Sequence, residues 1–227
     1  LAQVLTERLH RPVTTVENGF DTDDLTAIKS FTWPDQKVRL LYTGTVYPGK
    51  QSAVPLFTAL SLLCSHHPNL DQRLEVLFYG WNLEHLKTEI ETHNLGSIVR
   101  LGEPQPRSQI LAMQGSAHAL IFLDWQDPLA KGILTGKLFE YSFAGKPILG
   151  IGATPATAAG RLMLDLGVGH PVGNDPDAIA ALITSLLADR ALPYAPRRDK
   201  MQQYTRKHLA YRLLDLIIDA KARSATA

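Results

Sequence analysis

Short apolar runs alternate with amphipathic stretches along the 227-residue chain, and this alternation constrains the fold more than any other feature. Val38–Tyr42, Leu74–Tyr79 and His118–Leu123 are nearly continuous apolar runs of strand length, and Ala53–Cys64 has apolar residues at helical spacing. Strands that are apolar on both faces are typical of a parallel sheet covered by helices on both sides. We therefore predict an α/β fold with a doubly wound, Rossmann-like parallel sheet.

The remaining elements expected from the sequence continue the same alternation. They are strands at Ile98–Leu101 and Pro147–Ile151, helices at Leu83–Asn94, Pro106–Gln114 (stopped by Gly115) and Gly136–Ala144, a helix that Asp175 caps, and a long carboxyl-terminal helical segment. Ligands on doubly wound sheets bind beyond the carboxyl ends of the strands. We therefore expect a ligand site in the loops that follow the five predicted strands.

Charge and composition exclude several classes of function. Lys+Arg 23 against Asp+Glu 22 leaves a net charge of +1, which argues against a partner that is a nucleic acid. No apolar run reaches the ~20 residues of a membrane span, so we expect no integral membrane segment in this chain. The single cysteine, Cys64, favours a reducing compartment. We expect a cytoplasmic location, with peripheral attachment at the inner membrane face as a variant of it.

The loop after the first predicted strand is rich in glycine and ends in a lysine. Gly44 to Lys50 fits the pattern G-x-x-x-x-G-K, but the next residue is Gln51 where a nucleotide-triphosphatase P-loop needs Ser or Thr to hold magnesium. Pro48 also removes one of the N–H groups that would cradle phosphate. Three interpretations stay open: a P-loop, a plain turn, and, as the favoured one, a phosphate-binding loop of another kind.

A second candidate lies where a loop runs into the helix predicted from Gly136. Its first N–H groups, those of Gly136, Lys137 and Leu138, would be free for a diphosphate, and Lys137 would add a positive charge. Glu140, one turn further, could accept hydrogen bonds from ribose hydroxyls. The alternative is an ordinary exposed Lys137–Glu140 pair.

A third candidate is the stiff loop Gly102–Pro106, which contains two prolines. It could present backbone groups to a flat base, although a simple strand-to-helix connection explains it as well.

Four landmarks, in order, resemble the carboxyl-terminal half of a GT-B glycosyltransferase of the family 4 kind. They are Val16–Asp21 (the family's xNGxD turn after a strand), Tyr42–Thr45 with Lys50 downstream, Leu101-Gly102 leading to Gln105-Pro106, and Lys137–Tyr141 followed by Ala144–Leu149 (the family's KLFEYxAxGKPIL). The last landmark is the most specific, and together they cover nearly the whole chain.

This resemblance implies a domain layout. Residues 13–196 would form the domain that binds a nucleotide-sugar donor, and residues 197–227 a helical tail. Residues 1–12 would end a linker from an amino-terminal domain, absent here, that holds the acceptor; a first residue other than Met agrees with this expectation.

The resemblance also implies an activity: transfer of a sugar from a nucleoside-diphosphate sugar to an acceptor hydroxyl, with retained configuration and with neither metal nor cofactor. We expect the isolated chain to be inactive. The alternatives are a P-loop-type phosphotransferase and a non-catalytic interaction domain with a degenerate GT-B fold.

Site residues follow from the same landmarks. Lys50 and Lys137 would stabilise the leaving diphosphate, and the donor would be bound by Gly44, Thr45, Gln105 (at the base), Thr135, Gly136, Leu138 and Glu140 (at the ribose). Many family members carry a second Glu, which touches the sugar, eight residues before the ribose Glu, and this sequence has Gly132 there. Lys131, Leu134 or Thr135 would then have to take over that contact.

Overall fold

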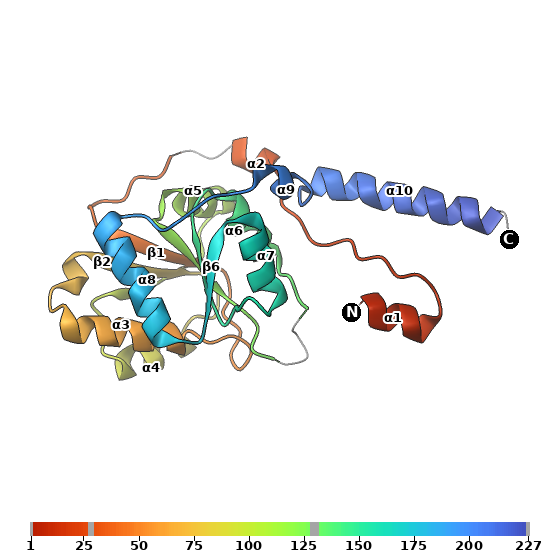
Figure 1. Cartoon of the computed structure of the whole chain (residues 1–227). Coiled ribbons are helices and arrows are strands. Elements are labelled where there is room, and N and C mark those ends of the chain that lie inside the picture. Colours follow the sequence, from red (N-terminus) through yellow and green to blue (C-terminus); the bar gives the residue numbers. More distant parts are fainter. Residues whose placement is uncertain (1, 27–29, 128–131, 226–227) are drawn as a thin grey trace.

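A single six-stranded parallel sheet forms the centre of the molecule (Figure 1). The computed structural model describes residues 2–26, 30–127 and 132–225, and within them the strand order is β3-β2-β1-β4-β5-β6. The strands are β1 (Val38–Thr43), β2 (Leu74–Tyr79), β3 (Val99–Gly102), β4 (Ala119–Leu123), β5 (Ile148–Ile151) and β6 (Gly169–Gly173). The prediction of a doubly wound parallel sheet is confirmed.

Within the described residues, three helices cover each face of the sheet. On one face lie α3 (Val54–His66), α4 (His85–Thr92) and α8 (Pro176–Asp189), and on the other lie α5 (Arg107–Ser116), α6 (Gly136–Phe143) and α7 (Ala158–Leu166). Successive side chains of a strand point to opposite faces. Leu40 and Tyr42 of β1 therefore enter the core under α3 and α8, whereas Leu41 enters the core under α6.

A local signal places the start of α8 where the sequence predicts it. The Asp175 carboxylate accepts hydrogen bonds from the N–H groups of Asp177 (3.0 Å) and Ala178 (3.3 Å), and Pro176 takes the first position of α8.

Three features differ from the sequence prediction. The pair α7–β6 was not expected, because β6 (Gly-His-Pro-Val-Gly) lacks an apolar run; as an edge strand it tolerates Pro171. Helix α5 continues through Gly115 to Ser116. No strand precedes Val16–Asp21 within residues 2–26, although the family landmark follows one.

The terminal segments lie outside the two helical layers. They form α1 (Ala2–Leu9), α2 (Asp23–Thr26), α9 (Arg198–Gln202) and α10 (Arg206–Ala225), while the 3-10 turn η1 (Leu70–Gln72) precedes β2. Phe20 ties the amino-terminal segment to α10: its N–H donates to Tyr204 O (3.0 Å) and its carbonyl accepts from Arg206 N (2.9 Å).

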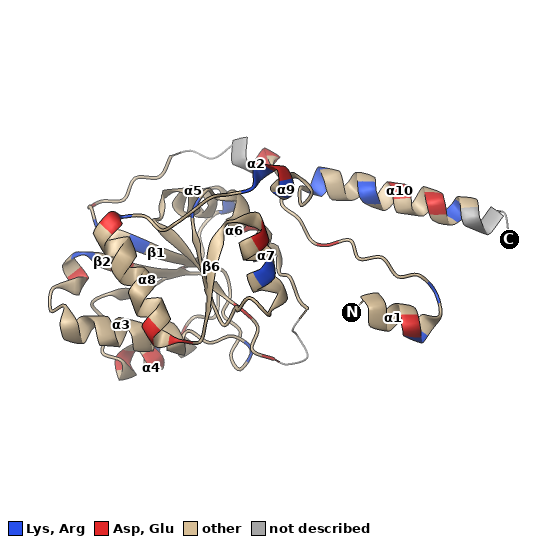
Figure 2. Ribbon diagram, viewed as in Figure 1, with Lys and Arg blue, Asp and Glu red and all other residues tan. Residues whose placement is uncertain are grey.

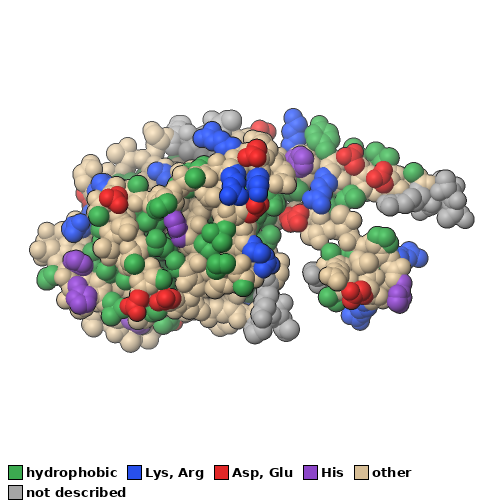
Figure 3. All heavy atoms as spheres, in the orientation of Figure 1, with side chains coloured by type: hydrophobic (Ala, Val, Ile, Leu, Met, Phe, Trp, Pro, Cys, Tyr) green, Lys and Arg blue, Asp and Glu red, His purple; other side chains and the backbone are tan. Residues whose placement is uncertain are grey.

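Helix α10 projects from the domain, and apolar side chains on both α10 and α1 lie on the surface (Figures 1 and 3). In the part of the chain that the structure describes, no helix is both long and apolar enough to cross a membrane. Charges of both signs are interspersed over the ribbon (Figure 2).

The strand order also locates the crevice that a doubly wound sheet offers to a ligand. The chain runs outward in one direction from β1 to β3 and in the other from β4 to β6, so the order reverses between β1 and β4. Ligands of such sheets bind beyond the carboxyl ends of the strands at this reversal.

Candidate functional site

A hollow of about 260 Å³ opens at the carboxyl ends of the strands on the β1 side of the reversal. Gly44, Gln105 and Glu140, one residue from each of the three predicted loops or helix starts, meet in its wall. The complete lining is Thr43, Gly44, Tyr79, Gly80, Trp81, Pro104, Gln105, Arg107, Ile110 and Glu140.

Two glycines allow the loops after β1 and β2 to touch at the floor of the hollow. Gly44 has φ +112°, and its N–H donates to Tyr79 O (2.7 Å). A Cβ on Gly80 would lie 2.2 Å from Gly44 O, closer than any side chain permits. The close approach of the two loops therefore requires glycine at both positions.

Lys137 extends from α6 back to the loop after β1. Its Nζ lies 3.7 Å from the centre of the Tyr42 ring, and a Cβ on Gly44 would be 3.0 Å from the same atom. Desolvation lowers the pKa of Lys137 to about 7, against a smaller opposing effect of the Glu140 charge. This amine lies beside Gly44, and a nearby negative charge would favour its protonated form.

Glu140 is held by two side chains from α5. Its Oε2 accepts from Arg107 Nη1 (2.8 Å) and its Oε1 accepts from Gln114 Nε2 (2.7 Å). Arg107 also donates to Asp24 at the start of the chain (2.5 Å). Glu140 thus pairs with Arg107, and the exposed Lys137–Glu140 pair considered as the alternative is not the arrangement seen.

Buried polar side chains link Glu140 to the end of β1. Gln114 Nε2 also donates to Thr43 Oγ1 (2.9 Å), and Thr43 N donates to the hydroxyl of Tyr141 (2.8 Å). Burial raises the pKa of Tyr141, so its hydroxyl stays protonated. These contacts fix Glu140 relative to the end of β1.

Lys50 and Thr45 lie on the same loop as Gly44 but do not line the hollow. Lys50 Nζ donates to Asp127 (2.7 Å), and the carbonyl of Thr45 accepts from the hydroxyl of Tyr42 (2.7 Å). The outer part of this loop packs on the segment after β4, where the rings of Tyr47 and Trp125 stack with centres 5.5 Å apart.

The start of α6 agrees with the prediction only in part. Thr135 is the residue before the helix, and a Cβ on Gly136 would meet Asn18 Nδ2 at 3.1 Å. The prediction that the N–H of Leu138 is free is wrong: it donates to Thr135 O (3.1 Å), a tightened first turn, and its side chain is fully buried. Lys131 lies outside the described residues.

Several residues of the wall or its support were not predicted from the sequence, among them Arg107, Gln114, Tyr79 and Trp81. Arg107 and Gln114 carry no motif and stand 33 and 26 residues from Glu140. Tyr79 and Trp81 could have been predicted, because they lie at the end of β2 and in the loop after it, where a doubly wound sheet binds ligands.

The carboxylates of two Asp-x-Asp sequences accept hydrogen bonds from backbone N–H groups close by in the chain. Asp21-Thr22-Asp23 and Asp175-Pro176-Asp177 are Asp-x-Asp sequences, but Asp21 accepts from Asp23 N (3.1 Å) and Asp175 caps α8. Among the residues that the structure describes, no cluster of three or more His, Cys, Asp or Glu could hold a metal ion.

Comparison with known proteins finds likeness in structure but not in sequence. Neither a protein-family model nor a curated protein sequence matches this chain. The lipopolysaccharide outer core galactosyltransferase WaaB in its apo form is similar with a TM-score of 0.58 at 13% identity, over 92% of this chain and 56% of WaaB. WaaG, a glycosyltransferase involved in lipopolysaccharide biosynthesis, gives 0.57 at 14%, over 90% of this chain and 60% of WaaG.

A third solved structure belongs to another enzyme class. A putative UDP-N-acetylglucosamine 2-epimerase from Listeria monocytogenes gives a TM-score of 0.55 at 14% identity, over 90% of this chain and 53% of the epimerase. The chain spans little more than half the length of these proteins. At these identities the likeness concerns the fold, and it confirms the expected Rossmann-like half of a GT-B fold.

Proposed function

We propose that the hollow binds the nucleoside diphosphate part of a nucleotide sugar, and that the chain is the donor-binding part of a glycosyltransferase. The observation that carries this proposal is the meeting of Gly44, Gln105 and Glu140 in one hollow at the carboxyl edge of the sheet. The acceptor would be held by a domain amino-terminal to this chain, so the isolated chain would bind donor without turnover.

The chemistry is displacement of the diphosphate by an acceptor hydroxyl. Negative charge grows on the leaving diphosphate, and Lys137 beside Gly44 supplies a fixed positive charge there once protonated. Glu140, oriented by Arg107 and Gln114, accepts from the ribose hydroxyls. Lys50 is the second candidate cation, which Asp127 would have to release. On this proposal the reaction needs no metal and retains configuration, in the cytoplasm.

Calorimetric titration with UDP, GDP and ADP tests the proposal directly. We expect at least one of them to bind, and Glu140→Ala to weaken that binding about tenfold, as expected for the loss of hydrogen bonds to a charged group. Glu91→Ala, an exposed carboxylate on α4, serves as the matched control and should leave binding unchanged. Absence of binding of all three nucleotides at millimolar concentration would remove the proposal.

The P-loop phosphotransferase alternative is disfavoured by the backbone of the loop after β1. The N–H groups of Lys50 and Gln51 both donate to Tyr47 O at 3.0 Å, and α3 begins only at Val54. These N–H groups are therefore occupied, whereas a P-loop needs them for phosphate. Magnesium-dependent ATP binding that is lost in Lys50→Ala would revive this alternative.

A nucleotide-sugar epimerase is the second candidate, because the epimerase from Listeria monocytogenes shares the fold about as closely as the two transferases. Product analysis on the full-length protein separates the two: a transferase forms a glycoside and releases nucleoside diphosphate, whereas an epimerase changes the configuration of the sugar. A non-catalytic domain, which Gly132 in place of a Glu favours, would do neither.

A further inference from the structure

Trp81 is the most exposed large apolar side chain in the described part of the protein, with 68% of its surface accessible. It follows β2 after Gly80 and precedes Asn82, whose φ of +56° turns the chain sharply. Because it is exposed, the indole contributes little to the core, and its flat surface is open to a ligand.

Two hollows share Trp81 as part of their wall. One is the candidate site, and the other, of about 200 Å³, continues past β3 and is bordered by Asn82, Glu84, Lys87 and Glu103. Gly80, Trp81 and Pro104 belong to both. Trp81 therefore lies where the two hollows meet, with the stiff proline of the loop after β3 at the same boundary.

The chemistry of the candidate site changes from one end to the other. Gly44 with Lys137 offers a site for an anion, and Glu140 offers acceptors for hydroxyls. Trp81 and Pro104 offer flat apolar surface. The other aromatic ring of the wall, Tyr79, already packs against the backbone, since a Cβ on Gly102 would contact that ring. The indole of Trp81 is the aromatic surface of this wall that remains exposed.

We propose that Trp81 is the stacking surface for the nucleobase of the bound nucleoside diphosphate, with the base seated at the junction of the two hollows. This inference rests on the proposed function and adds a specificity-determining residue to it. Stacking on an aromatic ring favours any nucleobase over a bare phosphate. Gln105 lines the same hollow, and its Nε2 donates to Glu103 O (3.2 Å); its amide oxygen would accept a hydrogen bond from the base edge.

The test combines calorimetry with tryptophan fluorescence, using UDP, GDP and ADP as probes and pyrophosphate and ribose 5-phosphate as base-free ligands. We expect Trp81→Ala to weaken binding of the nucleotide that binds best by about tenfold or more, with unchanged affinity for pyrophosphate. Trp81→Phe should retain most of the affinity. Tyr211→Ala, which removes a similarly exposed ring (60%) from α10, is the matched control and should change nothing.

Fluorescence gives an independent readout. The chain has three tryptophans, and nucleotide binding should quench the emission of the natural protein. In Trp81→Phe the nucleotide should still bind, as measured by calorimetry, but the quenching should disappear.

The outcomes separate the inference from the proposed function. Nucleotide binding that is equally tight in Trp81→Ala and the natural protein overturns the stacking role and leaves the proposed function standing. So does quenching that persists in Trp81→Phe. Failure of the natural protein to bind any of the three nucleotides overturns both.

Discussion

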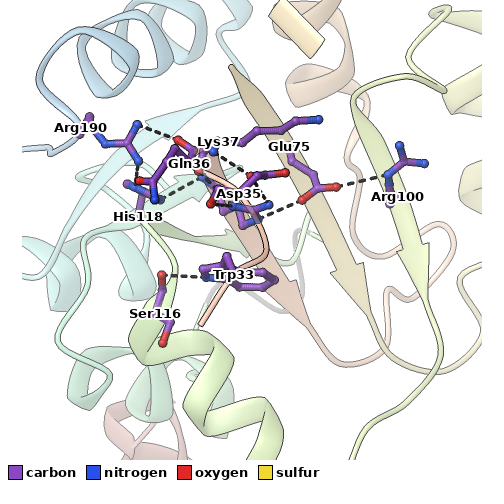
Figure 4. Close-up of polar contacts among 10 residues, drawn as sticks. Trp33, Asp35, Gln36, Lys37, Glu75, Arg100, Ser116, His118 and Arg190 are labelled. Carbon is purple, nitrogen blue, oxygen red and sulfur yellow. Dashed lines mark hydrogen bonds and ion pairs between the residues drawn. The ribbon is translucent and has the colours of Figure 1, made fainter. Parts of the chain in front are cut away.

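Both edges of the sheet carry charged side chains, but these side chains are arranged in opposite ways. At the amino edge, Arg39 of β1 is 1% exposed. Its partners Trp33, Asp35 and Glu75 lie close together (Figure 4). Its guanidinium donates to Asp35 (2.6 Å) and Glu75 (3.0 Å) and lies 4.7 Å from the centre of the Trp33 ring. The indole N–H of Trp33 in turn donates to Ser116 O (2.9 Å).

At the carboxyl edge, Arg107 and Glu140 line a hollow: Arg107 is paired yet 54% exposed, and Glu140 is half-buried. Lys137 does not line the hollow but lies beside Gly44, which does, and desolvation lowers its pKa to about 7. A charge in a closed network has its interactions satisfied by the protein, whereas a charge beside a hollow retains capacity for a ligand. We therefore expect the amino edge to contribute to stability and the carboxyl edge to contribute to ligand binding.

The largest effect should come from breaking the network at the amino edge. Arg39→Met leaves Glu75 without its buried partner, and we expect the free energy of unfolding to fall by about 3–5 kcal/mol. Urea unfolding measures this. Arg100→Met is the matched control, because Arg100 pairs with the same carboxylate (3.3 Å) from an exposed position and should cost less than about 1 kcal/mol. If both variants lose the same free energy of unfolding, the burial of Arg39 contributes nothing to stability.

Substitutions at the carboxyl edge should change the affinity for a nucleoside diphosphate. Lys137→Met should weaken nucleoside diphosphate binding about tenfold to a hundredfold, through loss of a charged donor. Because the pKa of Lys137 is about 7 in the free protein and an anion raises it, binding at pH 8 should take up a proton and affinity should fall between pH 6 and 8. Calorimetry in buffers of different ionisation enthalpy measures the uptake.

Lys146→Met provides the control for Lys137. Desolvation also lowers the pKa of Lys146, but this residue lies at the amino edge, before β5. Proton uptake that persists in Lys137→Met, or that disappears in Lys146→Met, would contradict the assignment.

A smaller effect is expected from His118, a further member of the network at the amino edge. Desolvation, followed by the charges of Arg190, Lys146 and Arg39, lowers its pKa from 6.5 to about 4. The unfolded chain therefore binds the proton more readily, and stability should fall as the pH drops from about 6.5 to 4. After allowance for solvent screening we expect about 1–2 kcal/mol.

Unfolding curves of the natural protein and His118→Gln across this pH range isolate that contribution. The variant should lose part of the pH dependence, while the affinity of the hollow for nucleotide stays the same. Identical pH slopes would exclude His118 as the cause.

The smallest effect is expected at Lys50. It is half exposed, and its pairing with Asp127 is a surface contact, so Lys50→Ala should change stability by less than about 1 kcal/mol. Nucleotide affinity should fall much less than in Lys137→Met, since Asp127 already satisfies the charge. A loss as large as that of Lys137→Met, measured by the same titration, would instead place Lys50 at the diphosphate.

The sequence predicts the central elements well because their signals are local. The buried runs at β1, β2 and β4 and the Asp175 cap of α8 each depend on a few neighbouring residues. Strand β6 was missed because an edge strand needs no apolar run: four of its five residues are only half-buried.

The sequence by itself determined the layered architecture and the edge of the sheet at which the candidate site lies. The spacing of apolar residues and the order of strands and helices along the chain are enough to predict both. Only the tertiary structure decided which groups meet there. Arg107 reaches Glu140 and Asp24, Gln114 reaches Thr43, and Trp81 separates two hollows, because parallel strands bring distant loops to one edge. No local pattern encodes those neighbours, since they depend on the order of strands in the sheet and on the packing of α5 and α6 against it.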